Sequence, residues 1–74
     1  MQPSSVSELT VPTLTETARG YPVMTVPRYD RAILLLIDGR RTIADISRLS
    51  RRTFLAVCAS LTRLSDQQLV DIPG

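Results

Sequence analysis

The sequence predicts a mainly α-helical fold, with a three-helix core and short flanking strands. Aliphatic residues recur at three- and four-residue spacings over 28–38, 43–49 and 51–65, which is the period of a helix with one buried side. Two shorter segments, 21–26 and 69–72, hold β-compatible residues next to prolines, as short strands do. A chain of 74 residues has room for one domain.

The N-terminal part of the chain differs in composition from the rest. Residues 1–20 are rich in Ser, Thr and Pro, with scattered aliphatic residues that follow no helical period. We expect a disordered arm here, because no apolar face offsets the entropy cost of ordering the segment. The domain should then span 21–74. Its first segment, 21–26, lies between Pro22 and Pro27 and is expected to form an edge strand.

The first helix is predicted over 28–38. Pro27 suits the start of a helix, and Asp30 lies near the positive end of the helix dipole. Gly39 follows Asp38 and is expected to stop the helix in the left-handed conformation that glycine adopts readily. Apolar residues almost surround this helix, which predicts a central position in the fold. They are Tyr29, Ile33, Leu34, Leu35, Leu36 and Ile37.

The second and third helices are predicted to follow in close succession. Thr42 with Asp45 three residues later is typical of a capping box that opens the helix over 43–49. Ser50 is a candidate N-cap for the helix over 51–65. A tight connection between two such helices predicts a helix-turn-helix. The strand expected over 69–72 follows directly, as in winged-helix domains.

This pattern resembles a family of small bacterial regulatory domains. The sequence ILLLIDGRRTIADI at 33–46, with the later segments 61–64 and 69–70, is similar to a bacterial winged-helix pattern and to the peptide-binding recognition elements of ribosomal-peptide maturation. The segment 17–20 resembles a Thr-x-Lys/Arg-Gly segment of some of these proteins. The resemblance implies a winged-helix-like fold.

Two departures from the winged-helix pattern concern the wing. Gln67 and Gln68 stand where such domains commonly have a glycine before the strand. The residues after Ile72 are too few for a further hairpin, so we expect a truncated wing. Its partner strand should come from 21–26 or from another chain.

The composition excludes most catalytic chemistry. The chain has no His and one Cys, so the usual general bases and metal ligands are almost absent. Cys58 lies on the apolar side of the third helix and is expected in the core, while Asp38 and Asp45 are expected to cap helices. We therefore expect a cytoplasmic, non-catalytic protein without metal or cofactor. Its longest apolar run, 33–37, is far shorter than the roughly 20 residues that span a membrane.

The middle of the chain is strongly basic. Between 28 and 63, eight Arg and three Asp leave a net charge of +5, and every basic residue in the sequence is Arg. Arginine forks suit phosphate and carboxylate alike. The candidates for nucleic-acid binding flank the predicted helix-turn-helix. They are Arg40, Arg41, Arg48, Arg51 and Arg52.

Two functions agree with these features. The first is weak DNA binding by a regulatory module through phosphate contacts, in which Arg51 and Arg52 open the helix that meets the groove. Specific base readout is not expected, since the outward positions Ala56, Ala59 and Ser60 are small. The alternative is a protein or peptide adaptor that uses the strand edge at 21–26 and an apolar helix groove. A homodimer stays open in both cases.

Overall fold

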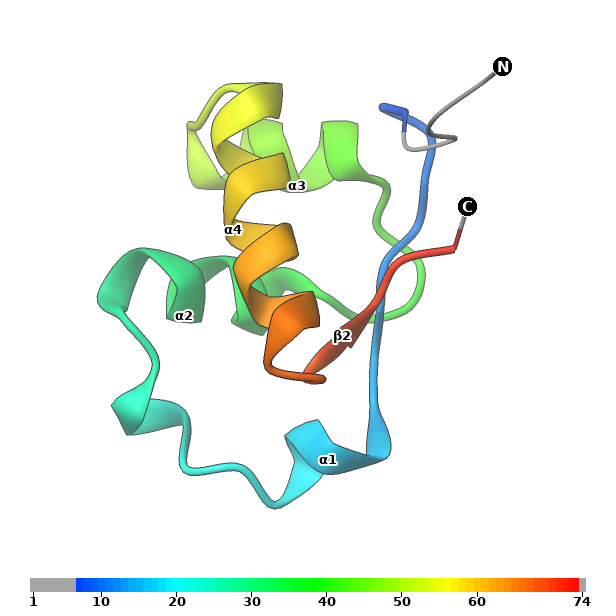
Figure 1. Ribbon diagram of the computed structural model, residues 1–74. Coiled ribbons are helices and arrows are strands. Elements are labelled where there is room, and N and C mark those ends of the chain that lie inside the picture. Colours follow the sequence, from blue (N-terminus) through cyan, green and yellow to red (C-terminus); the bar gives the residue numbers. More distant parts are fainter. Residues whose placement is uncertain (1–6, 74) are drawn as a thin grey trace.

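The computed structural model describes residues 7–73 as a mainly helical fold with a small sheet (Figure 1). In chain order the elements are β1 (Thr13–Leu14), α1 (Glu16–Arg19), the 3₁₀ helix η1 (Val23–Thr25), α2 (Arg28–Leu36), α3 (Ile43–Ser50), α4 (Phe54–Asp66) and β2 (Val70–Asp71). Helices α2, α3 and α4 pack against one another, and α4 spans the other two. The mainly α-helical prediction is confirmed.

The core lies between these three helices and β2. Each helix turns one aliphatic stripe inward, because apolar side chains at three- and four-residue spacings share one side of a helix. Leu69 and Val70 complete the core from the C-terminal side. The most deeply buried aliphatic side chains are Ile33, Ile43, Ile46, Val57, Leu61, Leu64 and Leu69.

The start of α3 follows the predicted capping box. The Asp45 backbone N–H donates to the Thr42 hydroxyl, and the Thr42 N–H donates to the Asp45 carboxylate, both at 3.1 Å. Helix α2 ends earlier than predicted, with Ile37 as its C-cap residue. Gly39 has the predicted positive φ, +80°, but stands in the loop two residues beyond that cap.

Helix α4 begins at Phe54, so the prediction that Ser50 caps it and that Arg51 opens it is wrong. Arg51 is instead the C-cap residue of α3, in the left-handed conformation with φ of 59°. Thr53 is the N-cap of α4, and its hydroxyl accepts from the Ala56 N–H at 3.1 Å. The Ser50 hydroxyl donates back to the Ser47 carbonyl, so Ser50 belongs to the last turn of α3.

The sheet is antiparallel and has two strands within residues 7–73. Thr13 lies opposite Asp71 and Leu14 opposite Val70, so the strand predicted over 69–72 is present as β2. The prediction that residues 21–26 supply the partner strand of β2 is wrong, because that segment contains η1.

Residues 21–26 turn rather than extend because their apolar residues meet the core at a three-residue spacing. Val26 is buried and Val23 is partly buried against the core, whereas a strand would point alternate residues to one side. The Val26 N–H donates to the Val23 carbonyl at 3.0 Å, which closes the 3₁₀ turn.

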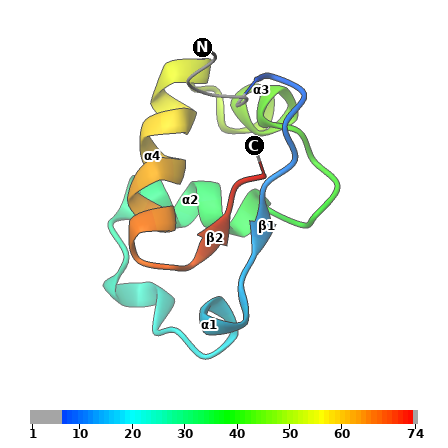
Figure 2. The same cartoon turned by 45° about the vertical axis from the view of Figure 1, so that its right-hand side comes forward.

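The chain before α1 differs from the predicted disordered arm, as residues 8–19 are built into the domain (Figure 2). The N–H groups of Ile43 and Ala44 donate to the carbonyls of Thr10 and Glu8, at 2.9 and 3.0 Å. Pro12 is fully buried. The physical reason is that the first amides of α3 and the edge of β2 need partners, which this segment supplies. The domain thus begins before residue 21, and residues 1–6 of the predicted arm lie outside the described residues.

Candidate nucleic-acid interface

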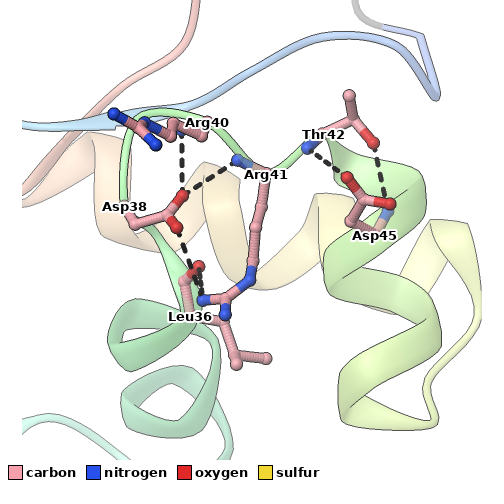
Figure 3. A network of polar contacts seen from close by, with 6 residues as sticks. All are labelled: Leu36, Asp38, Arg40, Arg41, Thr42 and Asp45. Carbon is pink, nitrogen blue, oxygen red and sulfur yellow. Dashed lines mark hydrogen bonds and ion pairs between the residues drawn. The ribbon is translucent and has the colours of Figure 1, made fainter.

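The loop between α2 and α3 is held together by Asp38 (Figure 3). Its carboxylate accepts from the backbone N–H groups of Arg40 and Arg41, both at 2.9 Å, and these bonds hold the Asp38 pKa below its ordinary value. The Arg41 guanidinium donates to the Leu36 carbonyl at 3.2 Å and lies 3.7 Å from Asp38. Arg41 therefore closes the C-terminal end of α2, whereas the Arg40 side chain is exposed.

The N-terminal end of α3 is closed to anions. Its first two N–H groups, on Ile43 and Ala44, donate to carbonyls of the N-terminal segment, and the third, on Asp45, donates to its own cap Thr42. Free N–H groups are what makes a helix N-terminus bind phosphate. Arg40, which precedes this end, therefore has no helix amides to support a phosphate contact.

Arg48 lies in the last turn of α3 and forms an exposed ion pair. Its Nη2 is 2.7 Å from Asp45 Oδ1, and its side chain is 73% exposed. The pKa of Asp45 is held below its ordinary value, first by the Thr42 N–H bond and then by Arg48. A pair this exposed contributes little to stability, because water and salt screen it. Arg48 can exchange this partner for another anion at small cost.

The turn between α3 and α4 carries two further arginines. The Arg52 guanidinium lies 4.1 Å from the centre of the Tyr29 ring, in a cation–π contact that fixes its position. The Arg52 carbonyl accepts from the Ser47 hydroxyl, which ties the turn to α3. Arg51 is exposed. Its left-handed backbone reverses the chain between the two helices.

The N-terminal end of α4 remains open. Thr53 satisfies the N–H of Ala56, while the N–H groups of Phe54 and Leu55 find no acceptor in the part of the chain that the structure describes. The positive end of the helix dipole lies here. The adjacent arginines and these amides together form a surface that attracts anions, which we name the α4 entry surface. Its members are Arg48, Arg51, Arg52, Phe54 and Leu55.

The structure divides the five predicted arginines into two groups. Arg48, Arg51 and Arg52 lie at the C-terminal end of α3, next to α4. Arg40 and Arg41 precede the opposite end of α3, an eight-residue helix about 12 Å long. The sequence had suggested one cluster because the positions are close in the chain, but α3 separates them in space.

Sequence reasoning missed an ion pair between α2 and α4. Arg63 donates to both carboxylate oxygens of Asp30, from Nε at 2.8 Å and from Nη2 at 2.7 Å, and Nη2 also lies 3.3 Å from the Ser60 hydroxyl. The Asp30 side chain is 2% exposed and that of Arg63 is 55% exposed. The bond to Arg63 holds the pKa of Asp30 below its ordinary value, and Asp30 raises the pKa of Arg63. Arg63 is thus occupied within the fold.

A signal for this pair was present in the sequence. Asp30 stands three, four and seven residues before Ile33, Leu34 and Ile37, which form the buried stripe of α2. A carboxylate on a buried stripe needs a partner. Its place near the helix start had suggested a dipole interaction instead.

The outward stripe of α4 carries little for reading bases. It consists of Leu55, Ala59, Thr62 and Asp66, all exposed. Ser60, expected on the outward side, is instead buried at 3% exposure beside Arg63. The stripe therefore holds no cation, and its only hydrogen-bonding side chains are those of Thr62 and Asp66.

Other chemistry finds little support within residues 7–73. Cys58 is partly buried against the core, and burial raises the pKa of its thiol. Across this described range, no group of three or more His, Cys, Asp or Glu residues could hold a metal ion. No helix there combines the length and the apolar character that a membrane crossing requires.

Comparison with known proteins finds no match among protein-family models, curated proteins or solved structures. The resemblance to winged-helix domains thus stays a prediction. A fold alone does not assign a role, so the function has to follow from the residues at the site.

Proposed function

We propose that this chain is a non-catalytic helix-turn-helix regulatory module with a reduced wing, which binds DNA weakly through its phosphates. One observation carries the proposal: three arginines stand at the open N-terminal end of α4. Arg48 and Arg51 lie at the C-terminal end of α3, and Arg52 lies in the turn that leads to α4, whose first two amides are unoccupied within the described chain. In helix-turn-helix proteins, this end of the second helix meets the DNA.

The physical basis of the contact is electrostatic. Guanidinium groups match phosphate oxygens with two parallel hydrogen bonds, and helix amides add neutral donors that point the same way. The outward stripe of α4 has no cation, so the proposed binding is largely independent of sequence. The reduced wing is the pairing of β2 with β1, which precedes the helices in the chain.

The alternative function, a protein or peptide adaptor, was predicted to use a strand edge at 21–26. That edge is absent, because the segment contains η1. DNA is therefore the better-supported partner for the α4 entry surface. A lone cysteine fits a reducing compartment, and we propose the cytoplasm as the setting.

The test is a titration of a fluorescent DNA duplex at several salt concentrations. We expect the double variant Arg51→Gly with Arg52→Gln to bind more weakly and to lower the slope of log K against log salt by about 0.9 per lost contact. Glycine is chosen at 51 because it adopts the left-handed conformation without strain, so the turn should survive. Circular dichroism checks the fold.

The matched control is Arg19→Gln with Arg40→Gln, which removes the same charge outside the α4 entry surface. Both side chains are exposed. We expect this control to keep the parental slope. An equal loss of slope in the two double variants, or an unchanged slope in the first, would contradict the proposal.

A further inference from the structure

We propose that the outward side of α2 is a docking surface for an acidic amphipathic helix of a partner protein. This surface, the α2 face, consists of Tyr29, Ala32 and Leu35, with Arg28, Arg31 and Met24 at its edges. The α2 face shares no residue with the α4 entry surface, although Arg52 of that surface contacts Tyr29. The inference does not rest on DNA binding.

The centre of the α2 face is apolar and largely exposed to solvent. Tyr29, Ala32 and Leu35 follow one another at three-residue spacing and are exposed, as is Met24 just before the helix. Leu35 is 71% exposed, Met24 76% and Tyr29 63%. An apolar patch rimmed by polar side chains is typical of a surface that binds another molecule.

The rim of the α2 face is positive and lacks compensating charge. The guanidinium groups of Arg28 and Arg31 form no ion pair with any described residue. The one carboxylate in α2, that of Asp30, points inward to Arg63 and is 2% exposed. Arg52 reaches the same side of the helix through Tyr29. The surface therefore complements a partner that carries carboxylates.

Two guanidinium groups, those of Arg31 and Arg52, lie directly beside apolar side chains. Arg31 Nη1 is 3.8 Å from Met24 Sδ, and Arg52 lies 4.1 Å from the Tyr29 ring centre. A matching partner must present apolar side chains and carboxylates side by side at fixed spacing. A helix with a leucine stripe edged by Glu or Asp does so. A duplex offers phosphates without an apolar stripe, and a fluid lipid surface offers no fixed anions.

The probe is a synthetic helix of about 18 residues, with Leu at helical spacing, Glu beside the Leu stripe and Ala elsewhere, long enough and rich enough in Ala to be helical alone. We expect it to shift the NMR amide signals of α2. Leu35→Ser should weaken binding about tenfold, as expected when a buried leucine is lost. Arg28→Gln with Arg31→Gln should weaken it further and reduce its salt dependence. Leu9→Ser, at a similarly exposed leucine of the N-terminal segment, is the matched control and should bind like the parent.

Four outcomes would overturn the proposal. The peptide could leave the α2 signals unmoved at millimolar concentration, or Leu35→Ser could bind it as tightly as the parent. A peptide with Lys in place of every Glu could bind equally well, which would remove the role of charge. The protein could also fail to bind the peptide but pellet with phosphatidylglycerol vesicles in a way that depends on Leu35. That result would show that the α2 face binds lipid instead. Arg51→Gly, which removes a proposed phosphate contact, should leave peptide binding intact and so separates this proposal from DNA binding.

Discussion

Gly39 has a φ of +80°, a conformation that costs residues with a β-carbon about 1–2 kcal/mol. A β-carbon built there would meet no atom within 4 Å, so the cost of substitution is conformational and not steric. We expect Asn to be tolerated best, Ala less well, and β-branched Val least. For a domain of this size, about 1 kcal/mol lowers the melting temperature by roughly 4–8 °C. Thermal unfolding of the three variants measures the order.

Gly20 provides the matched control for that series. It also has open space around it, but its φ is −103°, which any residue adopts. Gly20→Ala should therefore melt at or slightly above the parental temperature, because it lowers the entropy of the unfolded chain. Equal losses at Gly20 and Gly39 would show that the positive φ is not the cause.

Single residues also show where sequence reasoning stops. Gly39 and the pair Thr42 and Asp45 were predictable, because glycine and capping residues report their backbone conformation locally. Arg51 and Gln68 have φ values of 59° and 63°, yet neither residue type signals a left-handed turn. Gln68 takes the place where glycine was expected, and its carbonyl accepts from the Thr15 hydroxyl at 2.6 Å. At Gln68 that contact is distant in sequence, so no local pattern predicts the backbone conformation.

At the scale of elements, the pair of Asp30 and Arg63 joins α2 to α4. Asp30→Asn should cost about 1.5–3 kcal/mol at pH 7, as expected when hydrogen bonds to a charged partner are lost. Arg63→Gln should cost more, because it leaves a carboxylate that is 2% exposed without its cation, whereas Asn leaves a guanidinium that water still reaches. Urea unfolding of both variants measures the order.

The same pair predicts a pH dependence. Arg63 holds the pKa of Asp30 below its ordinary value of about 3.9, so the folded state binds the proton less well than the unfolded state. The stabilisation is complete above that value and is lost as the pH falls through the lowered pKa. The stability difference between the parent and Asp30→Asn should therefore shrink below about pH 4. A difference that stays constant down to pH 2 would show that the fold does not lower the pKa of Asp30.

Elements were predicted well where periodicity was long and poorly where it was short. The stripes of α2, α3 and α4 extend over eight residues or more and follow the helical period. The segment 21–26 is too short for its period to be read, so β-compatible composition suggested a strand where η1 forms. The boundary at Arg51 failed because Ser50 and Thr53 are both N-cap residues by type, and Ser is the more favoured of the two.

At the scale of the whole molecule, the N-terminal segment connects parts that are distant in sequence. Glu8 and Thr10 contact the start of α3 through their carbonyls, and Thr15 donates its N–H to the Leu69 carbonyl at 3.1 Å. Backbone groups make these contacts, so they leave no hydrophobic pattern in the sequence. For this reason, composition alone predicts a disordered arm. The separation of the five arginines by α3 likewise leaves no pattern in the sequence.

Substitutions at two adjacent residues of the N-terminal segment test whether it is part of the folded domain. Pro12 is fully buried and its neighbour Thr13 is exposed. Placing Gln at each position in turn therefore separates the effect of burial from the effect of the new side chain itself. Pro12→Gln places an amide in the interior and should cost about 1–3 kcal/mol, whereas Thr13→Gln should stay within about 0.5 kcal/mol of the parent. Urea unfolding gives both values. In the parent and in Thr13→Gln, heteronuclear NOE values from Glu8 to Thr10 should match those of α3, because both ends of their contact move together. Low heteronuclear NOE values from Glu8 to Thr10 in the parent, together with equal stability of the two variants, would contradict this prediction. They would show that the segment is a disordered arm, as its composition suggests.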